Sequence, residues 1–528
     1  MSAAVEGLDP LGGADPADDS FNPTLLDDSP SASPFLSPSL PPPPASTSTS
    51  TSTLSPGDPV WSDLVDRPLM ARLAKSVADV ELLSIAGKVT RVSGIIVEAT
   101  LPAVAVGTSC EIRLSATKTL TAEVVGFAKN RALLMPFGDV AGVGEGCSVV
   151  VRGVGANIPV GDALLGRVVD AAMRPVDGGP PPVLSRQAPL YAAPPHAMTR
   201  RRISRPLVLG IRSLDACLTC GEGQRVGIMA GPGIGKSVLM GMLARGAAVD
   251  VIVVGLVGER GREVREFVER DLGPTGLART VVVVATADEP PLVRVRAAVA
   301  ATAVAEYFRE RGKRVLLLID SLSRVAMAQR EIGLAAGEPP TSRGYPPSVF
   351  AALPRLVERA GNDAGEGSIT AMYTCLAEGD DMADPFVDAV RAALDGHIVL
   401  SRKLADAGHF PAIDVLASIS RVMNDVIKPE HRQLAMEARE VLATYRESAD
   451  LIEVGAYVSG SNPRVDRALR SVHLVNALFR QTPQERYPLQ STLDGLKRAL
   501  EGGGPIPASV VAPATAAMAT VAGEATRG

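Results

Sequence analysis

The sequence predicts an α/β protein with an N-terminal β-barrel, a central P-loop domain on a mostly parallel sheet, and a C-terminal helical domain. Short β-like runs separated by turn residues fill residues 82–160. Strand-like and helix-like stretches then alternate over 185–422, and the pattern over 423–500 is helical with no further strand. Such changes of periodicity along 528 residues are typical of a chain with several domains.

Both ends of the chain have compositions that do not support a packed core. Of the 30 residues from 29 to 58, 22 are Ser, Thr or Pro, and residues 1–66 contain ten Asp or Glu and no Lys or Arg. Such segments bury too little apolar surface to offset the entropy lost on ordering. We therefore expect a disordered arm over 1–60 and a flexible, Gly/Ala/Pro-rich tail over 501–528.

The barrel is predicted from four apolar runs, which are "AGKVTRVSGIIVEATL", "SCEIRLSA", "LTAEVVGFAKNRALLMPF" and "CSVVVRG". Strands this short and evenly spaced favour a small barrel. A linker that contains "DGGPPP" (177–182) follows. The central domain is predicted from the strands "QRVGIMA", "DVIVVGLVG", "RTVVVVATA", "KRVLLLID" and "SITAMYTCLAEG", separated by helical stretches such as 291–311. This alternation favours a parallel sheet with helices on both faces.

The segment "MAGPGIGKSVLM" (229–240) matches the phosphate-binding pattern G-x-x-x-x-G-K-[ST], except that Ala230 stands where the first glycine is usual. In this pattern backbone N–H groups surround phosphate oxygens, the lysine reaches the outer phosphates, and the hydroxyl binds Mg²⁺. A strand precedes the loop and a helix follows it, so the helix N-terminus favours an anion. The alternative is a glycine-rich turn that binds no ligand. The predicted binding residues are Gly231, Pro232, Gly233, Ile234, Gly235, Lys236, Ser237 and Val238.

Two acidic residues follow apolar strands of the same region. Asp320 ends "RVLLLID", where a carboxylate beside the P-loop can complete a Mg²⁺ site with Ser237. Glu259 follows "DVIVVGLVG" and can orient or deprotonate the water that attacks a γ-phosphate. The alternative for Glu259 and Arg260 is an ordinary solvated helix start.

Composition excludes several other functions. Five cysteines in so long a chain do not make a disulfide framework, and Cys217-x-x-Cys220 is better explained by two small buried residues than by a metal site. No apolar run approaches the ~18 residues that span a bilayer, and the acidic N-terminus lacks a signal segment, which points to the cytoplasm. The net charge of -5 and 3% aromatic content argue against nucleic-acid binding.

Several motifs occur in one characteristic order, which is "GPGIGKS", "GERGREVREF", "LLLIDSLSRVAMAQREIGLAAGEPP", "SRGYPPSVFAALPRLVERAG", "AEGDDMADP", "LDGHIVLSRKLA" and "FPAIDVLASISRVM". This order closely resembles the ATPases of bacterial type III protein secretion, which are related to the catalytic subunits of F-type ATP synthases. The resemblance covers roughly residues 80–500. It implies a β-barrel, a RecA-like ATPase domain and a C-terminal helical domain, assembled as a ring of six with nucleotide at the subunit interfaces.

Carried over by position, the resemblance makes Lys236 and Ser237 the phosphate and Mg²⁺ contacts, Asp320 the Walker B acid, and Glu259 the water-activating glutamate. Arg421, in "SISRV", matches the arginine that reaches the γ-phosphate of the neighbouring subunit. The alternative for Arg421 is a core-facing arginine at a strand end.

Three further features are implied by the same resemblance. Phe410 matches an aromatic position that packs on adenine, where relatives often have Tyr. Arg260 resembles a second cation on the phosphate side. The loop "EGDDMADP" (378–385) resembles the segment that faces the central pore or stalk, and its alternative is an acidic solvated turn. Because one chain carries both Glu259 and Arg421, copies of it can build a complete interface, which favours a homohexamer.

The leading hypothesis is a Mg²⁺-dependent ATPase that energises type III export by releasing chaperones from secreted proteins and unfolding them, with an injectisome favoured over a flagellum. The expected partners are a central stalk protein, a peripheral stator or regulator, export-gate components and chaperone–substrate complexes at the cytoplasmic face of the inner membrane. An RNA-translocating hexameric helicase and a non-hydrolysing nucleotide-binding scaffold are the alternatives. The first lacks a basic, aromatic-rich surface, and the second does not explain the intact catalytic positions.

Overall fold

A computed structural model describes residues 85–153, 157–376 and 384–503. The predicted N-terminal arm, most of the C-terminal tail and all but the last two residues of the acidic loop 378–385 lie outside these residues. No helix in the described ranges is both long and apolar enough to cross a membrane.

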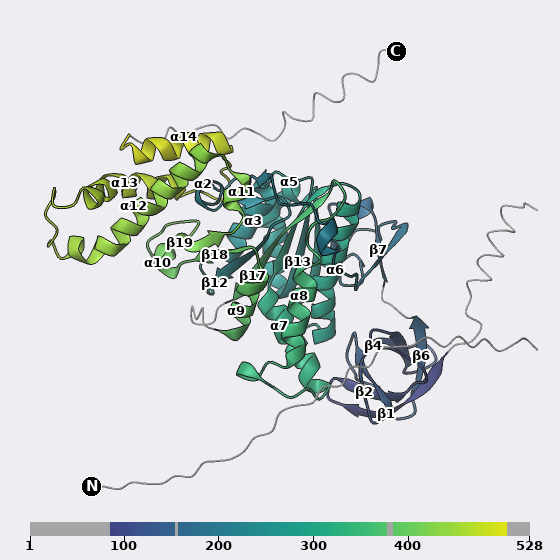
Figure 1. Cartoon of the computed structure of the whole chain (residues 1–528). Helices are drawn as coiled ribbons and strands as arrows, with labels where there is room; N and C mark the ends of the chain where they lie inside the picture. Colours follow the sequence, from purple (N-terminus) through teal and green to yellow (C-terminus); the bar gives the residue numbers. More distant parts are fainter. Residues whose placement is uncertain (1–84, 154–156, 377–383, 504–528) are drawn as a thin grey trace, which may run out of the picture. The chain divides into compact units, whose positions relative to one another are not determined.

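The N-terminal strands form a closed barrel in the order β1-β2-β5-β4-β3-β6, with antiparallel neighbours (Figure 1). Residues that point inward, such as Val97, Ala99 and Ile112, are fully buried. The predicted barrel is thus confirmed. Its strands are β1 (Ala86–Ser93), β2 (Ile96–Thr100), β3 (Ser109–Arg113), β4 (Thr119–Ala128), β5 (Arg131–Pro136) and β6 (Ser148–Gly153).

The central domain is built on a nine-stranded sheet in the order β19-β18-β12-β17-β15-β13-β14-β8, with β16 paired to β17. All pairs are parallel except β18 with β19 and β16 with β17. The strands are β8 (Val168–Asp170), β12 (Arg225–Ala230), β13 (Val251–Glu259), β14 (Thr280–Thr286), β15 (Arg314–Asp320), β16 (Gly361–Asn362), β17 (Ser368–Leu376), β18 (Gly396–Leu400) and β19 (Ile413–Ser420). Two small sheets pair β7 (Asn157–Val160) with β9 (Arg186–Pro189), and β10 (Pro206–Leu207) with β11 (Cys220–Gly221).

Helices cover both faces of this sheet, as alternation along β13 illustrates. Val251 and Val253 join one buried cluster with α6, whereas Ile252 and Val254 join another with α3. The helices are α2 (Arg212–Cys217), α3 (Lys236–Gly246), α4 (Gly261–Glu266), the π-helical η4 (Phe267–Leu272), α5 (Gly273–Leu277), α6 (Pro291–Glu310), α7 (Leu322–Ala335), α8 (Pro347–Val357), α9 (Pro385–Ala393) and α10 (Arg402–Asp406). Short 3₁₀ turns are η2 (Asp162–Leu164), η3 (Ala197–Thr199) and η5 (Ser342–Gly344).

The C-terminal domain is helical, as predicted, and its helices are α11 (Met423–Val426), α12 (Pro429–Glu453), α13 (Pro463–Phe479) and α14 (Leu489–Leu500) (Figure 1). Polar contacts attach it to the segment around α2. His431 Nε2 lies 2.8 Å from Ala216 O, and Gln481 Nε2 donates to Gly210 O at 2.8 Å. The fold class predicted from the sequence is confirmed in all three parts.

Four strands of the central sheet, β8, β16, β18 and β19, were not predicted, and β16 has only two residues. β8 has three residues, too few to show a period, and it precedes the expected start of the domain at residue 185. It nevertheless extends the sheet by pairing with β14. The strands β18 and β19 lie within the predicted domain. β18 is buried but has only five residues, which include Gly396 and His397, whereas β19 is the antiparallel edge strand and has mixed burial, so its apolar pattern is weak.

Candidate active site

Four neighbouring strands bring the candidate residues to one edge of the sheet. β12 leads into the P-loop, β15 ends at Asp320, β13 ends at Glu259, and Thr374 stands near the end of β17. The strands lie side by side in the order β12-β17-β15-β13 and run in parallel. Because the carboxyl ends of parallel strands meet, this edge is where α/β proteins bind ligands.

The P-loop has a backbone suited to an anion. Gly233 and Gly235 have φ values of +77° and +90°, which side chains rarely adopt. Helix α3 begins directly after Gly235, which offers no side chain to cap the first N–H groups. These groups and the positive end of the helix dipole favour phosphate. Of the remaining predicted binding residues, Gly231 and Ile234 are buried, Pro232 and Ser237 are exposed, and Val238 is partly buried.

Lys236 lies between two carboxylates. Its Nζ is paired with Asp320 Oδ1 and lies 3.5 Å from Glu259 Oε1, and all three side chains are at most 12% exposed. Burial alone lowers the pKa of Lys236, but the two carboxylates outweigh it and the net shift is upward. Among these three buried side chains, one cation therefore faces two carboxylates. The Asp320 carboxylate at the strand end and the Ser237 hydroxyl in the first turn of α3 are oxygen groups of the kind that Mg²⁺ prefers.

Glu259 is aimed by a local irregularity of β13. The pairing with β14 shifts register between Val257 and Glu259, and Gly258 between them has φ +70°. Burial, with Asp320 nearby, raises the pKa of Glu259 to about 7, although Lys236 acts in the opposite direction. A carboxylate that binds protons near neutral pH is suited to general-base chemistry.

Sequence reasoning missed two residues of this site. Arg324, in the first turn of α7, places Nη2 3.9 Å from Glu259 Oε2. The sequence feature that could have identified Arg324 is its position four residues after Asp320, which is one helical turn beyond the end of the strand. Thr374 donates its hydroxyl to Asp320 Oδ1 at 2.7 Å. The sequence feature that could have identified Thr374 is a threonine in a strand expected to be buried, since a buried hydroxyl requires a partner.

Phe410 lies beside the P-loop. A Cβ built on Gly235 would be 3.8 Å from its ring, and Phe410 is 46% exposed. The backbone N–H of Gln481 in the C-terminal domain donates to Phe410 O at 2.9 Å. An exposed ring next to a phosphate loop offers a stacking face for a planar base.

Arg260 and Arg421 lie outside the cluster around Lys236. Arg260 is 75% exposed at its side chain and pairs with Glu263 at 3.4 Å. Arg421 is exposed after β19, where its Nη2 lies 3.4 Å from Arg391 O. The structure therefore does not place either guanidinium against the P-loop of the same chain.

The cysteine pair is buried, as expected for two small core residues. Cys217 ends α2 and Cys220 begins β11, and burial raises the pKa of each thiol to about 12. Within the described ranges no group of three or more His, Cys, Asp or Glu is arranged to hold a metal ion.

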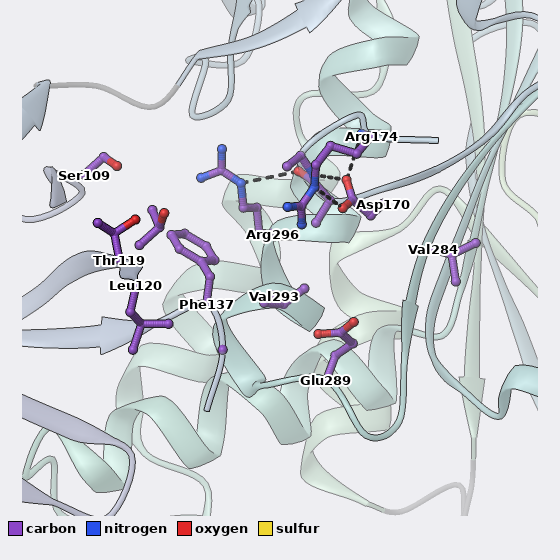
Figure 2. A pocket seen from close by; sticks show the side chains of 14 residues that line it. Ser109, Thr119, Leu120, Phe137, Asp170, Arg174, Val284, Glu289, Val293 and Arg296 are labelled. Atoms are coloured by element: carbon purple, nitrogen blue, oxygen red, sulfur yellow. Dashed lines mark hydrogen bonds and ion pairs between the residues drawn. The ribbon is translucent and has the colours of Figure 1, made fainter. Parts of the chain in front are cut away.

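A cavity of about 320 Å³ lies between barrel residues and the segments β8 and α6 (Figure 2). Arg296 borders it, with its guanidinium 5.2 Å from the centre of the Phe137 ring and 3.5 Å from Glu123. Arg174 pairs with Asp170 at 2.6 Å. Since each guanidinium already has a carboxylate, the cavity is a weaker phosphate site than the uncapped helix at the P-loop.

Comparisons with known proteins match all three parts of the fold. Three family models match the chain: "ATP synthase alpha/beta family, beta-barrel domain" over residues 89–153, "ATP synthase alpha/beta family, nucleotide-binding domain" over 210–420, and "T3SS EscN ATPase C-terminal domain" over 427–498. The matches follow the barrel, the sheet with the P-loop, and the C-terminal helices.

Two curated relatives are equally similar to the chain but carry different names. The type 3 secretion system ATPase of Sinorhizobium fredii is 49% identical over 433 residues, which cover 82% of this chain and 96% of the relative. The flagellum-specific ATP synthase of Bacillus subtilis is 49% identical over 417 residues, which cover 78% and 94%.

Among solved structures, the assembled ATPase EscN of the enteropathogenic E. coli type III secretion system matches with a TM-score of 0.75 and 44% identity. EscN in complex with its central stalk EscO matches with a TM-score of 0.73 and 43% identity. Each match covers 78% of this chain and 100% of the EscN chain.

Proposed function

The chain belongs to the family of ATPases that contains the type III secretion system ATPases and the flagellum-specific ATP synthases, and we propose that it uses Mg²⁺-dependent ATP hydrolysis to energise type III protein export. The observation that carries the proposal is the meeting of Lys236, Asp320 and Glu259 at the carboxyl edge of the sheet, beside an uncapped helix N-terminus. This arrangement contains a phosphate site, an oxygen-rich metal site and a base.

In the proposed reaction each residue acts on a different part of the nucleotide. Lys236 and the P-loop N–H groups bind the β- and γ-phosphates, and Ser237 with Asp320 would hold Mg²⁺. When bound, the metal neutralises charge that develops on the transferred phosphoryl group. Glu259 orients the attacking water and accepts its proton, since its raised pKa matches that task. Phe410 stacks on the adenine.

Arg421 supports a shared site. Its side chain is exposed, and among the described residues its guanidinium donates a long hydrogen bond, of 3.4 Å, to Arg391 O, so it is available to a neighbouring copy. In the proposed homohexamer Arg421 reaches the γ-phosphate held by the next subunit. Arg260 provides a second cation near the phosphates once its ion pair with Glu263 has broken. The assembled EscN structure, to which this chain is 44% identical, supports such an assembly.

We propose an injectisome as the export apparatus, with secreted proteins released from chaperones and unfolded. The segments "LTCGEGQRVGI" and "HIVLSRKLA" favour this branch, while relatives named for either branch are 49% identical. EscN in complex with EscO supports a central stalk as one partner. A peripheral stator or regulator, export-gate components and chaperone–substrate complexes would hold the ATPase at the cytoplasmic face of the inner membrane.

The proposal is tested by ATP turnover per subunit as a function of protein concentration, for wild type, Glu259→Gln, Arg421→Ala and an equimolar mixture of these two variants. If the site is shared, wild-type activity rises with concentration, each variant is nearly inactive, and the mixture recovers part of the rate. Arg464→Ala is the control, because Arg464 is a 69% exposed arginine on α13. A rate independent of concentration, with Arg421→Ala fully active, would contradict the shared site.

A further inference from the structure

A hydroxyl group on β17 contacts the carboxylate of Asp320 from within the sheet. Thr374 Oγ1 lies 2.7 Å from Asp320 Oδ1 and 3.4 Å from Ile319 O. A threonine hydroxyl has one proton to donate, and the shorter distance to a charged acceptor makes the carboxylate its partner. Thr374 is fully buried and Asp320 is 3% exposed, so bulk water competes little for this bond.

Asp320 Oδ1 has two partners that differ in mobility. Lys236 is paired with the same oxygen, but its long side chain serves the phosphates once nucleotide is bound. Thr374 has a short side chain on a central strand, and β15 and β17 are held in register by pairs such as Ile319 with Tyr373. The hydroxyl therefore stays in place when the ammonium group moves.

We propose that Thr374 is a positioning residue for the Mg²⁺–nucleotide complex. Its hydroxyl holds one oxygen of Asp320 in a single orientation, so the carboxylate remains ready to hold Mg²⁺ after Lys236 has turned to the phosphates. This inference rests on the proposed function, because it takes Asp320 as a residue of the metal site. It adds a neutral residue from the strand between the P-loop strand and β15.

The test compares ADP affinity with Mg²⁺ and with EDTA, measured by calorimetry on the full chain. Thr374→Val keeps the side-chain shape and removes the hydroxyl. We expect its ADP affinity in Mg²⁺ to fall about tenfold, the effect of losing a hydrogen bond to a charged group, with little change in EDTA. Thr374→Ser retains the hydroxyl and should keep the wild-type dependence on Mg²⁺. A general loosening of the fold would instead lower both affinities equally.

Thr302→Val is the matched control, because Thr302 is also fully buried but donates only to Ala298 O in its own helix at 2.9 Å. If thermal melting shows that Thr374→Val does not fold, Thr374→Ala replaces it. Alanine lacks the γ-methyl group that valine would place next to the Asp320 carboxylate. Unchanged Mg²⁺ dependence, or equal losses in Mg²⁺ and EDTA, would overturn the role of Thr374 alone. A wild type that binds ADP no better with Mg²⁺ would overturn the metal site itself and this proposal with it.

Discussion

Two centres of buried charge in the central domain are built in opposite ways. In the first, Arg359 bonds both oxygens of Glu306, with Nε at 3.0 Å and Nη2 at 2.5 Å. The remaining Nη1 donates to Leu190 O at 2.7 Å, and the two charged side chains are 4% and 8% exposed. One cation meets one anion, and the bidentate geometry uses the donors of the guanidinium.

The second centre, at the carboxyl edge of the sheet, has one buried cation and two carboxylates. Lys236 is shared by Asp320 and Glu259, and the partly exposed Arg324 lies 3.9 Å from Glu259. Burial, with Asp320 nearby, raises the pKa of Glu259 to about 7. A matched pair serves the fold, because its charges are complete without a ligand. In the proposed function the second centre serves a ligand, because Mg²⁺ and phosphate would add their charges to those of the chain.

Among the variants that test the difference between the two charged centres, Glu259→Gln is expected to have the largest effect, which is on the rate of ATP hydrolysis. Removing the general base should lower kcat about 10²- to 10⁴-fold, while the unfolding free energy does not fall, because one carboxylate suffices for Lys236. Steady-state ATP turnover and urea unfolding of the same preparation measure both. A marked loss of stability together with the loss of rate would mean that Glu259 is part of the structural framework.

Arg359→Met should have the reverse profile. It leaves Glu306 buried without its cation, which lowers the unfolding free energy by about 3–5 kcal/mol. The double variant Arg359→Met/Glu306→Gln should regain part of this loss, because no uncompensated charge remains. Urea unfolding checks both, and Arg464→Met on the exposed face of α13 is the control. A loss below about 1 kcal/mol, typical of exposed pairs, would contradict the assigned role.

The pH dependence of stability should separate the two centres. The folded-state pKa of Glu259, about 7, lies above its ordinary value of 4.5, so its contribution to stability is complete below pH 4.5 and lost as pH rises through 7. The stability advantage of Glu259→Gln over wild type should therefore grow across this window, by on the order of 2 kcal/mol. Thermal melting of both proteins from pH 4.5 to 8 measures the difference. A constant difference would contradict the raised pKa.

The same titration should appear in catalysis. Wild-type kcat/KM reports the free enzyme and should rise with pH through about 7, as Glu259 becomes able to accept a proton. ATP itself titrates in this range, and the residual rate of Glu259→Gln serves as the control for that contribution. The part of the rise in kcat/KM that is present in wild type and absent in Glu259→Gln is the part due to Glu259. Identical profiles in both proteins would assign the whole rise to the nucleotide.

The sequence was a better guide to the second centre than to the first. Lys236, Asp320 and Glu259 each follow an apolar strand of one alternating region, and parallel topology brings such strand ends together. Glu306 lies on α6 and Arg359 in the turn that follows α8, 53 residues further along the chain, and no local pattern relates them. Which arginine pairs with which glutamate depends on how helices dock on the sheet.

The contact partners of Thr374 and Arg421 could not be predicted from the sequence either, because they too depend on how distant segments come together. Burial of β17 was expected from its apolar pattern, but the partner of one hydroxyl depends on the register with β15. Arg421 was identified through a resemblance, and its side chain leaves the site of its own chain. Its proposed partner belongs to a second copy, so the role of Arg421 stays a prediction that only the assembled state can test.

The smallest expected effect concerns Tyr373, which precedes Thr374 on β17. The Tyr373 hydroxyl is fully buried and has no hydrogen-bond partner among the described residues, and burial raises its pKa. Tyr373→Phe should therefore leave the unfolding free energy unchanged or raise it by up to about 1 kcal/mol, since a buried hydroxyl without a partner is unfavourable. Urea unfolding measures this, and a loss greater than about 1 kcal/mol would show that the hydroxyl has a partner, such as an ordered water. Adjacent residues of one strand would then differ as the two charged centres do: the Thr374 hydroxyl meets a group of the active site, while the Tyr373 ring serves only the packing.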